Sequence, residues 1–167
     1  MTSSAGSWPH TANKGDPLGS ASPIDDQPQL DINDQFVPAS DARFVTRVVR
    51  AALAHAGRPD MRVSLLLTDD AEIGRIHGEF LGDDSATDVI SFEIDGGVDV
   101  VVSVERARQE AVSRGHSQEA ELALYITHGI LHACGYDDVE TSDRAAMRVA
   151  ERAVLAQLGL CVDDVDG

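Results

Sequence analysis

Aromatic residues are scarce in this chain, at 4% of 167 residues, although 43% of the residues are hydrophobic. A core built from this composition is therefore expected to be aliphatic. No stretch approaches the roughly 18 consecutive apolar residues of a membrane span. The N-terminus also lacks a charged segment followed by an apolar one, so neither a membrane helix nor a secretory signal is expected.

Cysteine is equally rare, because Cys134 and Cys161 are the only two in the chain. This number does not indicate a disulfide framework, and a reducing cytoplasm is the simplest compartment. Cys134 lies among the metal-ligand candidates described below and could serve as a soft ligand. The usual behaviour of a free cysteine favours a small buried thiol instead. We therefore expect a cytoplasmic protein without disulfide bonds.

Basic residues are outnumbered, since 13 Lys and Arg stand against 29 Asp and Glu and give a net charge of −16. This excess of negative charge argues against non-specific binding to nucleic acid over a broad surface. RNA binding would need a local arginine patch and a metal ion to offset the acidic field. Each candidate arginine taken alone is expected on a solvated helix face. The candidates are Arg58, Arg62, Arg75, Arg106, Arg108 and Arg114.

Composition divides the chain into a predicted domain and two tails. Residues 1–28 are rich in Ser, Gly, Pro, Asn and Asp and are predicted to be disordered. Residues 29–160 carry the periodic apolar patterns and are expected to form one domain, as the length suggests. Residues 161–167 form a short acidic tail.

The hydrophobic periodicity predicts an α+β fold, with a small mixed sheet of about four strands packed with about five helices. Strands are expected at residues 29–33, 61–67, 88–94 and 98–104. Helices are expected from Ser40 to Gly57, from Asp69 to Phe80, from Ser103 or Val104 to about Gly115, from Ser117 to Gly135 and from Thr141 or Ser142 to Gly159.

Local signals mark several of these boundaries. Asp69 followed by Glu72 resembles a capping box, and Ser117 is a suitable N-cap. A Gly-Gly pair at 96–97 between two strands predicts a hairpin, which makes part of the sheet antiparallel. In the helix ending near Gly115, Ala107, Ala111 and Val112 are predicted to face inward.

Residues 128–138 contain the strongest functional signal. His128 and His132 are four residues apart, so on a helix their side chains project about 40° apart and one turn apart. Gly135 can adopt a positive φ and end the helix, which lets Asp138 approach as a third ligand. Two histidines and one carboxylate leave a position for water, as in catalytic zinc sites. Such a histidine pair also occurs on ordinary helices, and the glycine and aspartate favour one bound Zn²⁺ at the end of this central helix.

The position beside the first histidine limits the chemistry. Zinc proteases of the H-E-x-x-H type carry their general base there, whereas this chain has Gly129. Asp137 and Asp88 are candidate bases or orienting groups. Asp137 can equally be a turn residue, or a hydrogen-bond acceptor that holds a ligand histidine, which is the role we favour. Asp88 can equally cap the start of a strand.

The segment from His128 to Asp137, with the pattern H-G-x-L-H-x-x-G-Y-D, resembles the signature of the YbeY family of endoribonucleases. Residues 87–92, T-D-V-I-S-F, are similar to the family's T-[DN]-V-L-S-F strand, and the likeness covers about residues 30–160. The resemblance implies a metal-dependent single-strand endoribonuclease acting in 16S rRNA 3′-end maturation and ribosome quality control. Its implied partners are ribosomal RNA or its precursor and ribosomal subunit proteins. The implied catalytic residues are His128, His132 and Asp137.

Two positions depart from the family pattern. The third histidine of the family is Asp138 here, and Leu81 stands where the family has an arginine that suits phosphate binding. These departures motivate one alternative, a ribosome-associated binding factor with weak or lost catalysis. The acidic body of the chain motivates another, a zinc hydrolase acting on a different substrate.

Overall fold

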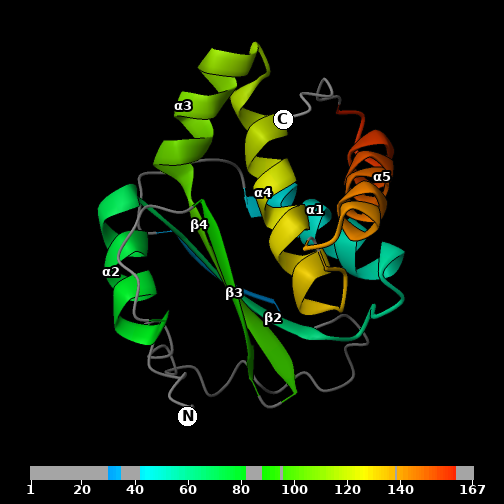
Figure 1. Ribbon diagram of the computed structural model, residues 1–167, viewed down its shortest axis with the longest axis horizontal. Helices are drawn as coiled ribbons and strands as arrows, with labels where there is room; N and C mark the ends of the chain where they lie inside the picture. The colour runs from blue at the N-terminus through cyan, green and yellow to red at the C-terminus, as the bar shows by residue number, and fades with distance from the viewer. Residues whose placement is uncertain (1–29, 35–41, 82–87, 95, 138, 161–167) are drawn as a thin grey trace.

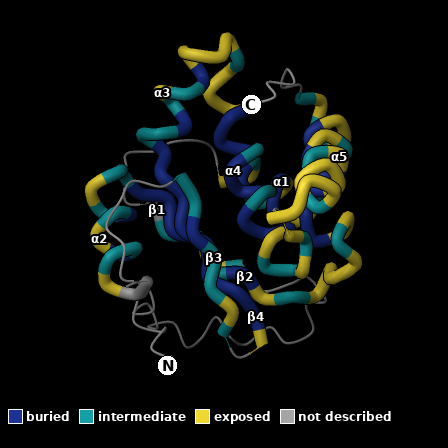
Figure 2. Tube along the Cα trace, in the orientation of Figure 1, coloured by how far each residue is buried: buried dark blue, intermediate teal, exposed yellow. Residues whose placement is uncertain are grey.

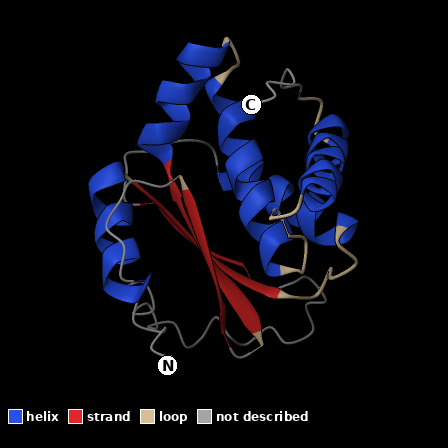
Figure 3. Ribbon diagram, in the orientation of Figure 1, coloured by secondary structure: helices blue, strands red, loops and turns tan. Residues whose placement is uncertain are grey.

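The computed structural model describes residues 30–34, 42–81, 88–94, 96–137 and 139–160, without the side chains of residues 34, 80 and 81. The two predicted tails, the predicted cap Ser40, the ligand candidate Asp138 and the side chain of Leu81 therefore lie outside the described residues. The elements, shown in Figures 1 and 3, are β1 (Leu30–Asp34), α1 (Ala42–His55), β2 (Arg62–Thr68), α2 (Asp70–Leu81), β3 (Val89–Ile94), β4 (Gly97–Ser103), α3 (Val104–Arg114), α4 (Gln118–Ala133) and α5 (Thr141–Gln157).

The four strands form one mixed sheet in the order β1-β2-β4-β3. β1, β2 and β4 are parallel, whereas β3 runs antiparallel to β4, with Ile94 opposite Gly97. Gly96 has a φ of 76°, which suits glycine in the tight connection between these two strands. The predicted α+β fold and hairpin are thus confirmed.

The helices cover the two faces of the sheet unequally. Leu65 and Leu67 of β2 belong to the larger core, which includes buried residues of α1 and α4, whereas Leu66 packs with Ile73 and Ile76 of α2 on the other face. This alternation follows from the two-residue period of a strand. All seven residues of β4 are buried, because helices lie on both of its faces (Figure 2).

α4 is the central helix predicted from the sequence, and it is buried over most of its circumference. It contacts β3, β4, α1, α3 and α5. The side chain of Ser117 accepts a hydrogen bond from the backbone N–H of Ala120, which confirms the predicted N-cap. The helix is therefore fixed along its length, and its side chains are held on a rigid element.

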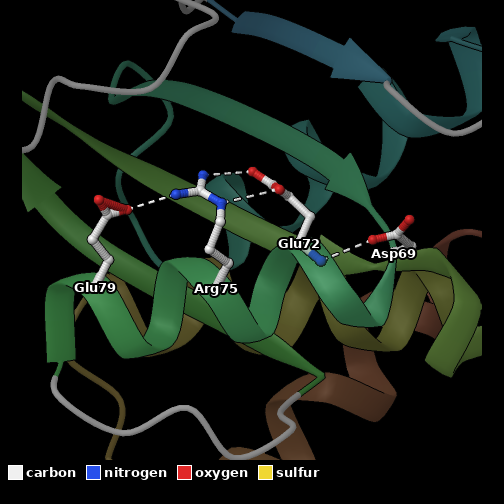
Figure 4. A network of polar contacts seen from close by, with 4 residues as sticks. All are labelled: Asp69, Glu72, Arg75 and Glu79. Carbon is white, nitrogen blue, oxygen red and sulfur yellow. Dashed lines mark hydrogen bonds and ion pairs between the residues drawn. The ribbon is translucent and has the colours of Figure 1, made fainter.

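Among the described helices, α2 covers the face of the sheet opposite to α1 and α4 (Figure 1). The carboxylate of Asp69 accepts a hydrogen bond of 2.9 Å from the backbone N–H of Glu72, which is the first half of the predicted capping box. The Glu72 side chain, the second half, accepts hydrogen bonds from Arg75 instead. Figure 4 shows the exposed side of this helix, where Arg75 forms ion pairs of 2.7 Å with both Glu72 and Glu79. The hydrogen bond to Glu72 raises the pKa of Arg75 above its ordinary range.

One predicted core position is wrong. Val112 was expected to face inward, but it is 79% exposed, whereas Ala107 and Ala111 are buried as predicted. α3 packs mainly against α4. Its buried residues are Val104, Ala107 and Ala111, a narrow stripe of one residue per turn, and Val112 lies about 100° away from Ala111. None of the helices in the described part of the chain combines the length and the hydropathy of a membrane-spanning segment.

Candidate active site

The two histidines lie on the least buried stripe of α4. His132 is exposed and His128 is partly exposed, whereas Gly129, Ile130 and Leu131 between them are buried. The two imidazole centroids are 6.1 Å apart, and the ring planes meet at 85°. The helix ends at Ala133 and Gly135 has a φ of 112°, so the chain turns immediately after the histidine pair, as predicted.

A carboxylate from another helix holds the first histidine. Nδ1 of His128 lies 2.6 Å from Oε2 of Glu151, which belongs to α5. The Glu151 side chain is 11% exposed and the His128 side chain 28% exposed. One ring nitrogen of His128 is thus engaged by the protein on its buried side.

Gly129 lets α4 approach the sheet closely at this point. A Cβ atom added to Gly129 would lie 2.8 Å from Cγ1 of Val100 and 2.9 Å from Cγ2 of Val89. The hydroxyl of Ser91 donates a hydrogen bond of 2.9 Å to the carbonyl oxygen of Gly129. A glutamate, as in the zinc proteases, cannot occupy this position without displacing the two valines, so the missing general base has a steric cause.

One turn before His128, a phenol is buried in the same helix. Tyr125 is 5% exposed, and its hydroxyl finds no hydrogen-bond partner among the described residues. Burial raises the pKa of Tyr125 above its ordinary range, and the negative charges of Asp88 and Glu121 raise it further. Asp88, one of the candidate bases, therefore lies near α4, just before β3.

The other predicted site residues follow the turn after α4. Asp137 is exposed, and Asp138 lies outside the described residues. Among the residues that the structure describes, no three His, Cys, Asp or Glu side chains gather around a common point. Cys134 is a partly buried free thiol, and burial raises its pKa. The roles predicted for Asp137 and Asp138 stay predictions.

The described part of the site has the donor chemistry of a histidine-bound metal ion. A ring nitrogen binds zinc at about 2.0–2.1 Å, so two rings with centroids 6.1 Å apart are within reach of one ion. A histidine ligand commonly donates its second ring N–H to a carboxylate, and Glu151 supplies such a carboxylate to His128. The residues present therefore fit a metal ion.

Three of the six candidate arginines are already engaged by carboxylates. Arg75 pairs with two glutamates on α2, Arg106 lies 3.8 Å from Asp70, and Arg114 lies 3.3 Å from Glu110. Their positive charges are thus largely offset where they stand. These three arginines are poor candidates for binding a phosphate backbone.

Sequence reasoning missed Glu151. It belongs to a helix whose buried residues are otherwise apolar: Met147, Ala150, Val154 and Leu155. A carboxylate within such an apolar stripe is unusual unless it has a partner. This signal was present in the sequence, but only the packing of α5 against α4 identifies the partner as His128.

The sequence profile described as "Endoribonuclease YbeY" matches residues 29–159. A protein named Endoribonuclease YbeY from Desulfitobacterium hafniense (strain Y51) is 35% identical over 153 residues, covering 78% of this chain and 98% of that protein. Another with the same name, from Roseiflexus castenholzii (strain DSM 13941 / HLO8), is 34% identical over 154 residues, covering 81% and 97%.

The fold also resembles a solved structure. The solution structure of TM1509 from Thermotoga maritima matches with a TM-score of 0.57 and 20% sequence identity, covering 78% of this chain and 92% of that one. At this identity the likeness concerns the fold alone. The profile, by contrast, matches residues 29–159, and the two relatives are 35% and 34% identical over 78% and 81% of this chain, so the chain belongs to the endoribonuclease YbeY family.

Proposed function

We propose that this protein is a metal-dependent endoribonuclease that cleaves single-stranded RNA at His128 and His132, on the least buried stripe of α4. The observation that carries the proposal is the histidine pair on the least buried stripe of that helix, with ring centroids 6.1 Å apart. Family membership supports cleavage of RNA as the reaction. Neither the binding-factor alternative nor the alternative of a different hydrolase draws support from the names of the relatives.

In this proposal, His128, His132 and Asp138 bind one zinc ion. When bound, such an ion lowers the pKa of a coordinated water and polarises a phosphoryl oxygen. Gly129 provides no base, so the proton of the attacking group must be accepted elsewhere. Asp137, exposed just after Gly135, is our candidate for that role. The histidine-holding role favoured for Asp137 from the sequence is given up here, because Glu151 already lies against His128. The attacking group is either water or the 2′-hydroxyl of the RNA itself.

The proposed substrate is precursor ribosomal RNA, within 16S rRNA 3′-end maturation and ribosome quality control, with ribosomal subunit proteins nearby. A cytoplasmic location belongs to the same proposal. Because the chain carries a net charge of −16, RNA must be bound through local positive charge rather than through the overall field. A cation held by His128 and His132 would supply part of this charge at the point where the phosphate reacts.

The test compares metal content and RNA cleavage in the wild type, in His128→Ala and in His55→Ala. His55 is an exposed histidine in the last turn of α1, so its replacement controls for the loss of one imidazole. We expect one zinc ion per chain and cleavage of a single-stranded RNA in the wild type and the control, and loss of both in His128→Ala. Stoichiometric metal without metal-dependent cleavage would refute the nuclease proposal.

A second variant addresses the departure at Leu81. Replacing this residue with arginine restores the group that the family resemblance implies for gripping a phosphate through two hydrogen bonds. We expect Leu81→Arg to cleave RNA faster than the wild type. If the two proteins cleave at the same rate, well above background, the idea of a binding factor with lost catalysis is rejected.

A further inference from the structure

Glu151 is a nearly buried carboxylate at the contact between α5 and α4. It lies on α5, 23 residues after His128, and its Oε2 is 2.6 Å from Nδ1 of that histidine. Its side chain is 11% exposed. Removing a carboxylate from water is costly unless the group is paired and hydrogen-bonded, and His128 is a partner at hydrogen-bond distance.

Stability alone is a weak reason for such a pair. A buried charged group and its partner contribute little net stability compared with apolar side chains of similar volume. This interface also has an apolar part, in which Leu131 of α4 packs with Met147 and Ala150 of α5. An apolar residue at position 151 would continue that packing. The carboxylate therefore points to a requirement at His128 itself.

We propose that Glu151 is a positioning residue for the metal site, an inference that rests on the proposed function above. Its carboxylate accepts the Nδ1–H of His128, because an ionised carboxylate can only accept hydrogen bonds. The imidazole then keeps its lone pair on Nε2, at the opposite edge of the ring. This bond selects the ligating nitrogen and fixes the ring plane before any ion arrives.

A second histidine–glutamate pair with the same Nδ1–Oε2 distance serves as an internal comparison. Nδ1 of His116 lies 2.6 Å from Oε2 of Glu121, and Arg114 lies 3.5 Å from the other carboxylate oxygen. The His116 side chain is only 4% exposed, against 28% for His128. An imidazole as deeply buried as that of His116 cannot bind a metal ion from solution. Glu121, which holds this imidazole, should therefore not affect metal binding.

The first measurement needs no variant of Glu151. Long-range ¹H–¹⁵N correlation spectra of the metal-free wild type, recorded above the ordinary range of histidine titration, report which nitrogen of His128 carries the proton. His128→Ala assigns the signals. The proton is expected on Nδ1. A proton on Nε2 would overturn the proposal, whatever the variants do.

The second measurement is zinc affinity by competition with a chromophoric chelator. Glu151→Gln is expected to weaken zinc binding by about 10- to 100-fold, the usual cost of losing a carboxylate that supports a ligand histidine. Glu121→Gln removes a carboxylate that is buried even more deeply than Glu151, and it is expected to leave zinc affinity within about twofold of the wild type. Circular dichroism establishes that each variant is folded.

A folded Glu151→Gln with wild-type zinc affinity and an unchanged His128 tautomer would contradict the assignment. If Glu151→Gln does not fold, the tautomer in the wild type decides the question alone. Neither measurement uses RNA. Should zinc affinity depend on Glu151 while the zinc-loaded wild type fails to cleave RNA, the nuclease proposal fails and the positioning role stands.

Discussion

Gly129 of α4 lies so close to Val100 of β4 that a Cβ atom on the glycine would stand 2.8 Å from the valine Cγ1. The side chain of valine is branched at Cβ and has little freedom to rotate away. The glycine is therefore a packing requirement in the middle of a helix, where alanine would ordinarily be preferred by about 1 kcal/mol.

We therefore predict that Gly129→Ala destabilises the protein. Overpacking costs about 1–3 kcal/mol and the helical preference for alanine returns about 1 kcal/mol, which leaves a net loss of up to about 2 kcal/mol. Equilibrium denaturation by urea measures this difference. Val100→Ala on the same background should recover part of the loss, as a double-mutant cycle would show. A Gly129→Ala protein as stable as the wild type would mean that helix and sheet are not in such close contact.

Replacing Tyr125 with phenylalanine is expected to stabilise the protein by about 1 kcal/mol near neutral pH, because the variant removes a buried hydroxyl without a partner among the described residues. Tyr136→Phe, at the other tyrosine of the chain, is the control. The free energies of unfolding of the three proteins are compared by denaturant titration. A loss of stability in Tyr125→Phe would indicate that the hydroxyl is bonded after all.

The same variant carries a prediction in alkaline solution. Burial raises the pKa of Tyr125 above the value of about 10 that the unfolded chain has. The neutral phenol therefore favours the folded state, and this stability is complete below about pH 10 and is lost as the pH rises toward the folded-state pKa. The wild type should lose more stability above pH 10 than Tyr125→Phe does. Parallel curves for the two proteins would exclude this linkage.

Arg148 of α5 is expected to help bind RNA. It lies three residues before Glu151 and so on the neighbouring part of the helix surface, and it is partly exposed. Arg148→Ala should weaken RNA binding. It should also reduce the slope of log affinity against log salt concentration by about one. Arg75→Ala makes the same change in net charge on α2, across the sheet, where Glu72 and Glu79 already pair with the arginine. If both substitutions weaken RNA binding equally, RNA affinity depends only on the net charge of the protein.

Asp138 is predicted to be the third metal ligand. Asp138→Ala should lower zinc affinity, because it removes one of three protein ligands, whereas Asp138→His should retain or raise it. Chelator competition on the purified variants measures both. If the alanine variant binds zinc as well as the wild type, Asp137 or water provides the third contact.

Features that depend on neighbours in the sequence were predictable. Asp69 caps the helix that it precedes, and Gly135 stops α4 with a positive φ, because capping and turns are made within a few residues. Val112 was mispredicted, because the burial of a position depends on how wide a stripe the neighbouring helix covers. The strand order β1-β2-β4-β3 was likewise not predicted, since it depends on pairing between distant segments.

The sequence by itself determined the secondary elements, the helical spacing that places His128 and His132 on one face, and the glycine that ends their helix. All of these follow from backbone geometry over one or two turns. Only the tertiary structure decided that Glu151 holds His128 and that Gly129 lies against Val100. These contacts join residues 23 and 29 positions apart in the chain. They exist because apolar surfaces of α4, α5 and the sheet pack together, and no local pattern encodes which side chains then meet.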